Sequence, residues 1–464
     1  MNVYGLVLAA GQGKRMKSKL YKVLHPVCGV PMVGHVVNLL ESMQTAQNIV
    51  IVGHGAEAVQ AYLGDRVSYA LQAEQLGTGH AVQQAASLLA DKEGITVVIC
   101  GDTPLITKES LDEMIARHQQ RGASATILSA QLPDPTGYGR IIRGKDESVL
   151  RIVEQKDCSP EEAAICEINT GTYCFDNRKL FEMLPKLTNQ NAQGEYYLTD
   201  VIGLLQQAGE KVEAYCLKDA AEATGVNDRI ALAEVERAMR QRIIEEHMRK
   251  GVTVIDPANT YIGPDVEIGA DTILYPGVHL TGQTVIGEDC EIGPNCQIDQ
   301  SRIEAGVHIT QSVLKQAEVQ TGASIGPFAY LRPGAQIGPQ AKIGDFVEVK
   351  NARIGAGSKV SHLSYVGDAD IGQDVNVGCG AITVNYDGFA KHRTIVEDGA
   401  FVGSNVNLIA PVHVGKGAYV VAGSTITHDV DAGDLAIARE RQTNKPGYAA
   451  KLKSRIQSRN QSQN

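Results

Sequence analysis

Aliphatic residues recur at every sixth position through most of the second half of the chain, and glycine often follows them. A six-residue period of this kind is typical of hexapeptide-repeat parallel β-helices, in which each unit is one short strand and one turn. Four runs carry the pattern: Ile262, Ile268, Leu274, Leu280, Ile286, Ile292 and Ile298; Val313, Val319, Ile325, Leu331, Ile337, Ile343 and Val349; Ile354, Val360 and Val366; Val396, Val402, Leu408, Val414, Val420 and Ile426.

The period predicts a left-handed β-helix shaped as a triangular prism. Three units close one coil, the aliphatic residue points inward, and small residues let the chain turn each corner. Because neighbouring strands lie about 4.8 Å apart, about ten coils give a rod roughly 50 Å long. Two stretches interrupt the pattern, at 299–312 and at 383–394. Loops that leave a rigid scaffold often carry binding sites, and the polar sequence TVNYDGFAKHRT makes the second stretch a candidate.

The first half of the chain follows a different pattern. Up to about residue 227, short β-rich segments alternate with segments that have helical spacing of apolar residues. The predicted strands are VYGLVLAA, NIVIVGH, VSYALQ, ITVVICGD and ATILSAQL, and the predicted helices are HAVQQAASLLADK and KESLDEMIARHQQRG. This alternation predicts a Rossmann-like α/β domain whose mostly parallel sheet is covered on both faces.

One amphipathic helix over residues 228–250 separates the two patterns. Asn227 or Asp228 is its expected N-cap, and Gly251 follows its end. Its expected apolar stripe is Ile230, Val235, Met239, Ile243 and Met248. We therefore predict an N-terminal domain over 1–227, a linker helix over 228–250 and a β-helix domain over 251–464. The last segment, after residue 437, is basic and polar, and we expect it to be extended and partly disordered.

Composition excludes several classes of protein. A net charge of -10 over 464 residues argues against general nucleic-acid binding, although local donors can still bind small phosphates. The N-terminus lacks the features of a signal peptide, and no apolar run approaches the roughly 20 residues that span a bilayer. Nine cysteines without a C-x-x-C pair indicate reduced thiols and a cytoplasmic protein.

Two segments of the first domain suggest phosphate chemistry. The glycine-rich turn GQGKRM follows the first strand, where backbone N–H groups can approach a phosphate that Lys14, Arg15 and Lys22 neutralise. Its spacing matches neither common nucleotide-binding motif, so a simple turn is the alternative. Asp102 ends the strand ITVVICG at the edge where ligands of parallel sheets bind, and its carboxylate suits Mg²⁺. A helix-capping aspartate is the alternative there.

Taken together, these segments resemble the sugar nucleotidyltransferase family. LAAGQGKRM, KVLHP, QAEQLGTGHAV, GDTPLI, GYGRII, IVEQKD, EINTGTY and GVND occur in that family's order and register. Over essentially its whole length the chain resembles the bifunctional N-acetylglucosamine-1-phosphate uridyltransferase/glucosamine-1-phosphate acetyltransferases. Lys14 departs from the threonine that is common there, and Tyr21 from the proline found in many members.

The resemblance implies two reactions of UDP-N-acetylglucosamine synthesis, and hence of bacterial cell-wall building. The C-terminal domain would transfer an acetyl group from acetyl-CoA to glucosamine 1-phosphate. The N-terminal domain would then transfer uridylyl from UTP to the product with Mg²⁺, releasing pyrophosphate. The resemblance implies that the nucleotide and its phosphates lie along Leu8, Ala9, Ala10 and Gly11, that the phosphates contact Arg15 and Lys22, and that uracil is read by Gln72, Gly77 and Thr78. It also implies that the metal is held by Asp102 and Asn227. The sugar phosphate would contact Gly139, Glu154 and Asn169.

In the β-helix, His362 and Tyr365 are expected on the outer surface. A neutral imidazole can take the proton of a glucosamine amine and so make it a nucleophile, although a lone surface histidine is the alternative. By resemblance, His362 is the general base, and the acceptor phosphate is bound by Arg332 and Lys350. The resemblance places Tyr365 and Asn376 at the sugar, and Asn385 and Tyr386 at the sugar and the acetyl-CoA donor. It places Cys379 and Ser404 at the thioester, and Ala422 and Arg439 along coenzyme A.

A prism with flat faces offers no deep pocket, so we expect a homotrimer with each acetylation site between neighbouring subunits. Two other functions are possible. In the first, the β-helix is a non-catalytic scaffold attached to a nucleotidyltransferase, against which its length, His362 and the 383–394 segment argue. In the second, both halves are binding modules without activity, against which the retained Lys22, Asp102 and Lys350 argue.

Overall fold

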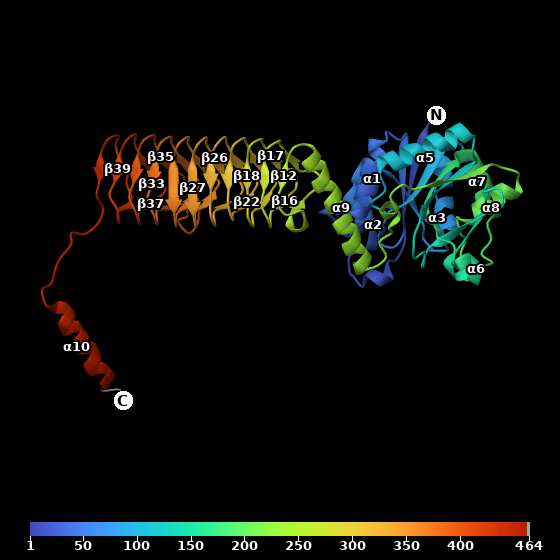
Figure 1. Ribbon diagram of the computed structural model, residues 1–464. Coiled ribbons are helices and arrows are strands. Elements are labelled where there is room, and N and C mark those ends of the chain that lie inside the picture. The colour runs from blue at the N-terminus through green and yellow to red at the C-terminus, as the bar shows by residue number, and fades with distance from the viewer. Residues whose placement is uncertain (462–464) are drawn as a thin grey trace. The chain divides into compact units, whose positions relative to one another are not determined.

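The computed structural model describes residues 1–461 (Figure 1), so the last three residues of the predicted second domain, 462–464, lie outside the described residues. The chain forms two compact units. The first comprises Met1–Glu246 with Ile262–Pro264, and the second comprises His247–Tyr261 with residues 265 onward.

The first unit is built on a mixed, mostly parallel sheet with the strand order β11-β7-β10-β6-β1-β4-β5. Strand β10 runs antiparallel to both β6 and β7, whereas β1, β4, β5 and β6 are parallel. The strands are β1 Val3–Ala9, β4 Gln47–Val52, β5 Ser68–Leu71, β6 Ile95–Cys100, β7 Ala125–Gln131, β8 Gly139–Arg143, β9 Val149–Val153, β10 Glu167–Asp176 and β11 Val212–Cys216; β2 Pro26–Val27 and β3 Val30–Pro31 form a separate hairpin. Each of the five predicted strands is confirmed.

Helices cover both faces of this sheet, as the alternating pattern predicts. Two apolar clusters lie on its two sides, one containing residues of α1, α2 and α5 and the other residues of α3, α7 and α8. The helices are α1 Met32–Ser42, α2 Ala56–Leu63, α3 Thr78–Gln83, α4 Ala86–Leu89, α5 Lys108–Arg121, α6 Pro160–Ala163, α7 Asn177–Met183 and α8 Asp200–Gln207. The prediction of one helix over 80–92 is wrong, because the helix breaks between α3 and α4.

Helix α9, Arg229–Arg249, occupies the region predicted as a linker helix. Its cap is Asp228, whose Oδ1 accepts hydrogen bonds from the backbone N–H groups of Ile230 and Ala231, both at 2.9 Å. The expected apolar stripe is only partly confirmed. Val235 is buried, but Ile230 is 73% exposed and Met248 is 44% exposed.

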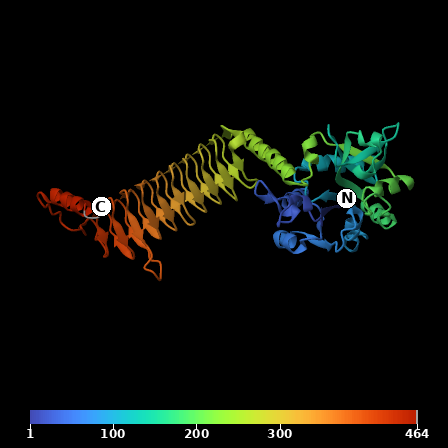
Figure 2. The same ribbon diagram turned by 90° about the horizontal axis from the view of Figure 1, so that it is seen from below.

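The second unit is a left-handed parallel β-helix (Figure 2). Sheet I contains β12 Thr253–Val254, β15 Ile273–Leu274, β18 Glu291–Ile292, β21 His308–Ile309, β24 Ser324–Ile325, β27 Lys342–Asp345, β30 Lys359–His362, β33 Asn376–Val377, β36 Phe401–Val402, β39 Tyr419–Val420 and β41 Leu435–Ala436. Sheet II contains β13 Tyr261–Ile262, β16 His279–Thr281, β19 Gln297–Asp299, β22 Val313–Lys315, β25 Tyr330–Leu331, β28 Glu348–Lys350, β31 Tyr365–Gly367, β34 Ile382–Val384, β37 Asn407–Ile409 and β40 Thr425–Ile426. Sheet III contains β14 Glu267–Ile268, β17 Val285–Ile286, β20 Arg302–Ile303, β23 Glu318–Val319, β26 Gln336–Ile337, β29 Arg353–Ile354, β32 Ala369–Ile371, β35 Thr394–Val396 and β38 Val412–Val414.

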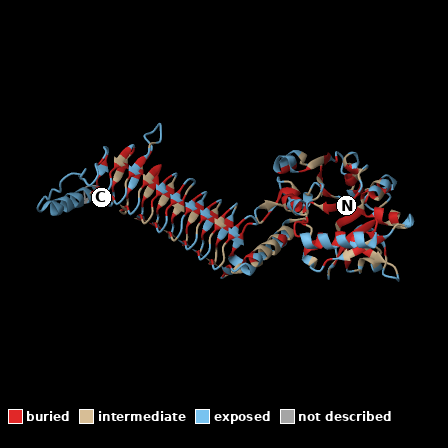
Figure 3. Ribbon diagram, turned by 90° about the horizontal axis from the view of Figure 1, so that it is seen from above, coloured by how far each residue is buried: buried red, intermediate tan, exposed pale blue. Residues whose placement is uncertain are grey.

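Aliphatic residues are buried in the prism along its length. Figure 3 shows buried residues recurring from coil to coil of its ribbon. The predicted register is wrong at Val313, because Leu314 is the fully buried residue of β22 and Val313 is only half-buried. The break at 299–312 is not an excursion. Strands β19, β20 and β21 continue the coils, and the buried residues Ile298 and Ile303 are five positions apart instead of six.

The second predicted interruption does leave the prism. The chain departs after β34 and returns at β35, and between them an isolated antiparallel bridge joins Tyr386 to Lys391. We call residues 385–393 the active-site loop because it contains Asn385 and Tyr386, two of the residues predicted for the second site.

The basic C-terminal segment is not wholly extended, contrary to the prediction. Helix α10 spans Tyr448–Gln461, a stretch rich in the good helix formers Ala, Lys, Leu, Arg and Gln. Its side chains from Tyr448 to Asn460 are exposed. No helix within residues 1–461 is long and apolar enough to cross a membrane.

Candidate active sites

A pocket of about 310 Å³ opens at the carboxyl end of the first unit's sheet. The chain proceeds outward from β1 to β4 and β5 and then returns to β6 on the other side of β1. Such a reversal of strand order is where open α/β sheets bind ligands. The pocket is lined by the predicted residues Leu8, Ala9, Ala10, Gly11, Lys22, Gln72, Gly77, Thr78 and Asp102.

Three polar side chains meet around the ammonium group of Lys22 in this pocket. Its Nζ forms an ion pair with the carboxylate of Asp102 and donates a hydrogen bond of 2.8 Å to Asn227 Oδ1. Arg15 Nη2 donates to the same amide oxygen at 2.8 Å. The carboxylate and the amide oxygen therefore reach a single cation, which fits the predicted role of Asp102 and Asn227. Mg²⁺ commonly takes one or two such protein ligands and completes its shell with water and substrate phosphates.

The wall predicted to read the nucleobase is held rigidly by its own hydrogen bonds. Gln72 Nε2 lies 3.0 Å from the carbonyl oxygen of Gly77 and 3.1 Å from His80 Nδ1. Thr78 Oγ1 accepts from the backbone N–H of Leu198 at 3.0 Å. Gly77 has φ 115°, and a Cβ there would lie 2.5 Å from the carbonyl oxygen of Tyr196. This position therefore requires glycine.

The residues predicted to contact the sugar phosphate lie outside the residues that line this pocket. Gly139 and Asn169 are paired opposite each other on β8 and β10, and Asn169 Nδ2 donates to the hydroxyl of Tyr173 at 2.7 Å. Burial raises the pKa of the Glu154 carboxyl. Burial, with help from the Asp102 and Glu154 carboxylates, also raises the pKa of Cys100 to about 12. Glu154 therefore lies close enough to the pocket for its charge to act on Cys100, as the charge of Asp102 does.

Sequence reasoning missed part of the pocket wall, notably Gln75, Cys100 and Glu195. Gln75 lies inside the segment QAEQLGTGHAV, which carries part of the family resemblance, so the motif could have indicated it as a pocket residue. Glu195 belongs to a stretch without such a motif, and only the folded chain brings it to Gly77 and Thr78.

In the β-helix, the residues predicted around the thioester form a column at the corner between sheets I and II. His362 ends β30, Cys379 follows β33, and Ser404 follows β36. Backbone bonds connect successive coils along this corner: Gly380 N–H donates to His362 O at 3.3 Å, Asn405 N–H to Cys379 O at 2.7 Å and Gly423 N–H to Ser404 O at 2.8 Å.

The remaining predicted contacts of this site extend the column. Tyr365 opens β31, just past the corner, and Asn376 opens β33. Ala422 follows β39 on the outermost of these coils. Arg439 lies beside it, because a Cβ placed on Gly423 would be 3.6 Å from Arg439 Cδ.

A second group, of cations, lies at the other end of the sheet II strands. Arg332 follows β25 and Lys350 ends β28. Lys391 of the active-site loop comes next to Lys350, and its ammonium group lowers the pKa of Lys350. Arg332 contributes to the same lowering and is paired with Glu348 at 2.7 Å. Clustered cations of this kind suit a phosphate dianion. Lys391 was not predicted individually, although its segment was.

The active-site loop is fixed to the prism through Asp368. One carboxylate oxygen accepts from Asn385 Nδ2 and the other from Asn351 Nδ2, each at 2.5 Å. The hydroxyl of Tyr386 donates to the carbonyl of Gly388 at 2.7 Å, and its ring is exposed. The structure therefore places the Asn385 amide group in a structural hydrogen bond and leaves Tyr386 accessible.

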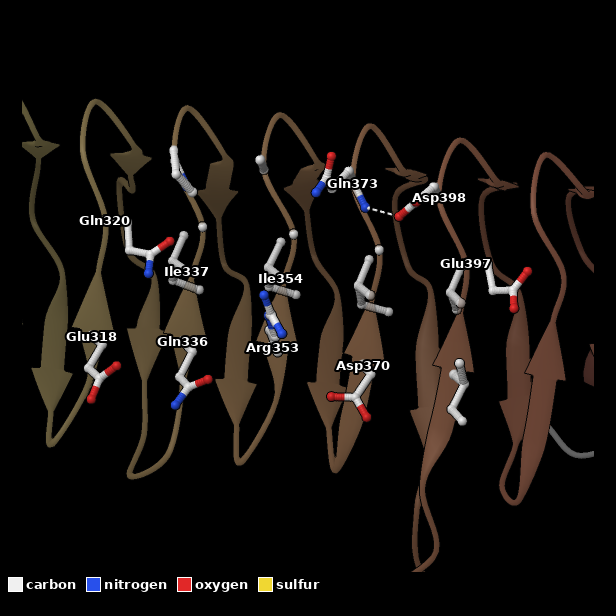
Figure 4. A pocket seen from close by; sticks show the side chains of 18 of the residues that line it. Glu318, Gln320, Gln336, Ile337, Arg353, Ile354, Asp370, Gln373, Glu397 and Asp398 are labelled. Carbon is white, nitrogen blue, oxygen red and sulfur yellow. Dashed lines mark hydrogen bonds between the residues drawn. The ribbon is translucent and has the colours of Figure 1, made fainter.

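A larger hollow, of about 760 Å³, lies on sheet III (Figure 4). Its outward side chains include Glu318, Gln336, Arg353 and Asp370. Asp370 is already neutralised by two hydrogen bonds of 2.5 Å from Arg393. Because none of the predicted site residues lines this hollow, size alone does not identify the catalytic surface.

Comparison with known proteins agrees with this division into two sites. A family model described as nucleotidyl transferase matches residues 4–237, and a model described as hexapeptide repeat of succinyl-transferase matches residues 393–428. A bifunctional protein GlmU of Brevibacillus brevis is 60% identical, over 97% of this chain and 98% of that protein. Proteins of the same name from Shouchella clausii and Geobacillus thermodenitrificans are 57% and 56% identical, over 97% and 98% of this chain and 99% of each relative.

Proposed function

The chain belongs to the family of bifunctional GlmU proteins, and we propose how its residues divide the two reactions between them. The protein is a uridyltransferase and acetyltransferase of UDP-N-acetylglucosamine synthesis. Its co-substrates are acetyl-CoA and UTP, and its metal is Mg²⁺. One observation carries the assignment of residues: each unit gathers one charged site. In the first unit, a carboxylate, an amide and a second cation lie around Lys22. In the second unit, a histidine and a group of cations lie along sheet II.

In uridylyl transfer, a phosphate oxygen of N-acetylglucosamine 1-phosphate attacks the α-phosphorus of UTP in line, and pyrophosphate leaves. The reaction needs no protein nucleophile, so positioning and charge neutralisation carry it. Lys22 and Arg15 neutralise the phosphates. Asp102 and Asn227 would hold Mg²⁺, which would supply further charge neutralisation. Leu8 to Gly11, Gln72, Gly77 and Thr78 hold the nucleotide, while Gly139, Glu154 and Asn169 hold the sugar phosphate.

In acetyl transfer, His362 takes a proton from the amine of glucosamine 1-phosphate. The nitrogen then attacks the thioester carbon of acetyl-CoA, the C–S bond breaks, and coenzyme A leaves with a proton. Arg332 and Lys350 hold the acceptor phosphate, and we add Lys391 to this group. Tyr365, Asn376, Asn385, Tyr386, Cys379, Ser404, Ala422 and Arg439 hold the sugar and the donor as the resemblance implies.

The protein assembles as a homotrimer of β-helices and acts on small molecules. We also propose that it is cytoplasmic. The thiols support this location, since all nine cysteines are free among residues 1–461.

A coupled assay tests the two activities together. With glucosamine 1-phosphate, acetyl-CoA, UTP and Mg²⁺, we expect UDP-N-acetylglucosamine and pyrophosphate. Omitting UTP should leave coenzyme A release intact, and supplying N-acetylglucosamine 1-phosphate should remove the need for acetyl-CoA. If coenzyme A is never released while uridylyl transfer proceeds, the β-helix is a scaffold and the proposal fails.

Alkylation of Cys379 should block acetyl transfer. This thiol is half-buried at the corner column, between the positions of His362 and Ser404, where added bulk would occupy the proposed place of the thioester. Coenzyme A release is measured before and after treatment with N-ethylmaleimide. The residual activity of a Cys379→Ala variant should resist the reagent, because the exposed thiols Cys166 and Cys216 lie in the first unit. Normal acetylation by protein that mass spectrometry shows to be fully modified at Cys379 would refute the placement.

A further inference from the structure

The partner of the His362 imidazole is a carboxylate that neither the sequence motifs nor the relatives' names point to. We propose that Asp345 is a positioning residue for acetyl transfer: it accepts the Nδ1 proton of His362 and leaves Nε2 free to take the proton of the sugar amine. The proposal rests on the proposed function of His362 as general base.

The backbone holds the two residues opposite each other. Strands β27 and β30 are parallel neighbours in sheet I, and Asp345 pairs in register with His362. Asp345 Oδ1 lies 2.5 Å from His362 Nδ1. Both residues end their strands at the corner between sheets I and II, where the Leu363 N–H donates to the Asp345 carbonyl oxygen at 2.9 Å. The imidazole therefore has little freedom to rotate without losing this contact.

Charge assigns the direction of this hydrogen bond. The hydrogen bond with His362 holds the pKa of Asp345 below its usual range, so this side chain is an ionised carboxylate near neutral pH. An ionised carboxylate can only accept, which places the proton on Nδ1 and the lone pair on Nε2. The nearby groups do not compete: Lys342 and Lys359 are cations on the two strands themselves, and β33 on the other side contributes the uncharged Asn376 and Val377, with Cys379 after it.

The arrangement has a consequence for the reaction. When Nε2 takes the proton from the amine nitrogen, the imidazole becomes a cation, and the adjacent carboxylate stabilises that cation. Asp345 itself stays ionised throughout, and the proton leaves Nε2 when the cycle closes. The Asp345 carboxylate thus holds His362 in the tautomer with its proton on Nδ1 before the proton transfer, and it stabilises the imidazolium that the transfer forms.

Carboxylate–histidine pairs also occur elsewhere on the prism, and they provide a control. Glu291 and His308 face each other across one coil of sheet I at 3.2 Å, as Asp345 and His362 do. Their strands, β18 and β21, lie on coils that carry none of the proposed acetylation residues. Position on the corner column beside Cys379 and Tyr365, and not pairing alone, distinguishes Asp345.

The test is the pH dependence of kcat/KM for acetyl transfer in Asp345→Asn and Asp345→Ala, with Glu291→Gln as the matched control. Removing the negative charge makes the protonated imidazole less favourable, so the acid limb of the profile should move to lower pH by about half a unit or more. We expect kcat to fall roughly tenfold or more in Asp345→Ala. The loss should be smaller in Asp345→Asn, whose amide oxygen can still accept from Nδ1. KM for acetyl-CoA and the rate of uridylyl transfer should not change.

Two results would overturn the proposal: profiles of Asp345→Asn and the unaltered protein that superimpose, or an equal displacement in Glu291→Gln. Failure of the underlying function looks different. In that case His362→Ala would keep its acetyl transfer, whatever Asp345 does.

Discussion

Replacing Asp102 by Asn is expected to abolish uridylyl transfer and to leave acetyl transfer at its unaltered rate. The carboxylate pairs with Lys22, and both it and Asn227 Oδ1 reach the position of one cation. An amide in its place removes the negative charge that, in the proposed assignment, would hold Mg²⁺. Because charge neutralisation carries this reaction, we expect a loss of about a thousandfold or more. Pyrophosphate release from UTP and N-acetylglucosamine 1-phosphate measures it, and coenzyme A release measures the other reaction.

The matched control for this change is Asp112→Asn. Asp112 lies on α5, where its carboxylate forms an exposed ion pair with Lys108 at 2.5 Å, and such pairs contribute little. Both activities should survive in the control. If both activities also survived in Asp102→Asn, the assignment of the metal ligands would be wrong, because uridylyl transfer would then not need the negative charge of Asp102.

The sequence predicted the β-helix well because its period reflects a local rule: each strand buries one aliphatic residue and each corner needs a small one. The errors occur where a coil is shortened. The spacing of buried residues is five between Ile298 and Ile303, and again five between Leu314 and Val319, so counting back six positions from Val319 selects Val313 instead of Leu314. A period indicates which residues are buried, but the length of each turn depends on packing between coils, which the count does not contain.

The site residues divide in the same way. Some pocket residues stand in continuous sequence motifs, so the motif itself indicates that they line the site; examples are Gly77, Thr78 and Asp102. Glu195 and Asp345 do not stand in such motifs. Glu195 reaches its pocket from a distant part of the chain, and Asp345 meets His362 one full coil away, 17 positions earlier. Pairing between coils is invisible in a list of motifs, although it follows directly from the register of sheet I once the coils are known.

The Lys22 contacts also bear on the metal site that we propose at Asp102 and Asn227. In the structure its ammonium bridges Asp102 and Asn227, and it therefore satisfies two oxygens that would otherwise repel the phosphates of a substrate. We expect this ammonium to pair with the phosphates of a bound substrate, which would leave the two oxygens available to hold Mg²⁺. This expectation agrees with the proposed contact of Lys22 with phosphate.

Replacing His362 by Ala is expected to lower acetyl transfer by about 10² to 10⁴-fold, the range for loss of a general base, while uridylyl transfer continues. His308→Ala, on a coil without acetylation residues, should keep both activities. The variant's residual acetyl transfer should rise steadily with pH, because solvent then supplies the neutral amine that the imidazole no longer generates. A residual rate independent of pH, or a variant as active as the unaltered protein, would show that the amine loses its proton to another group. In that event the column of Tyr365, Cys379 and Ser404 would still bind the substrates, but the base would have to come from elsewhere in the trimer.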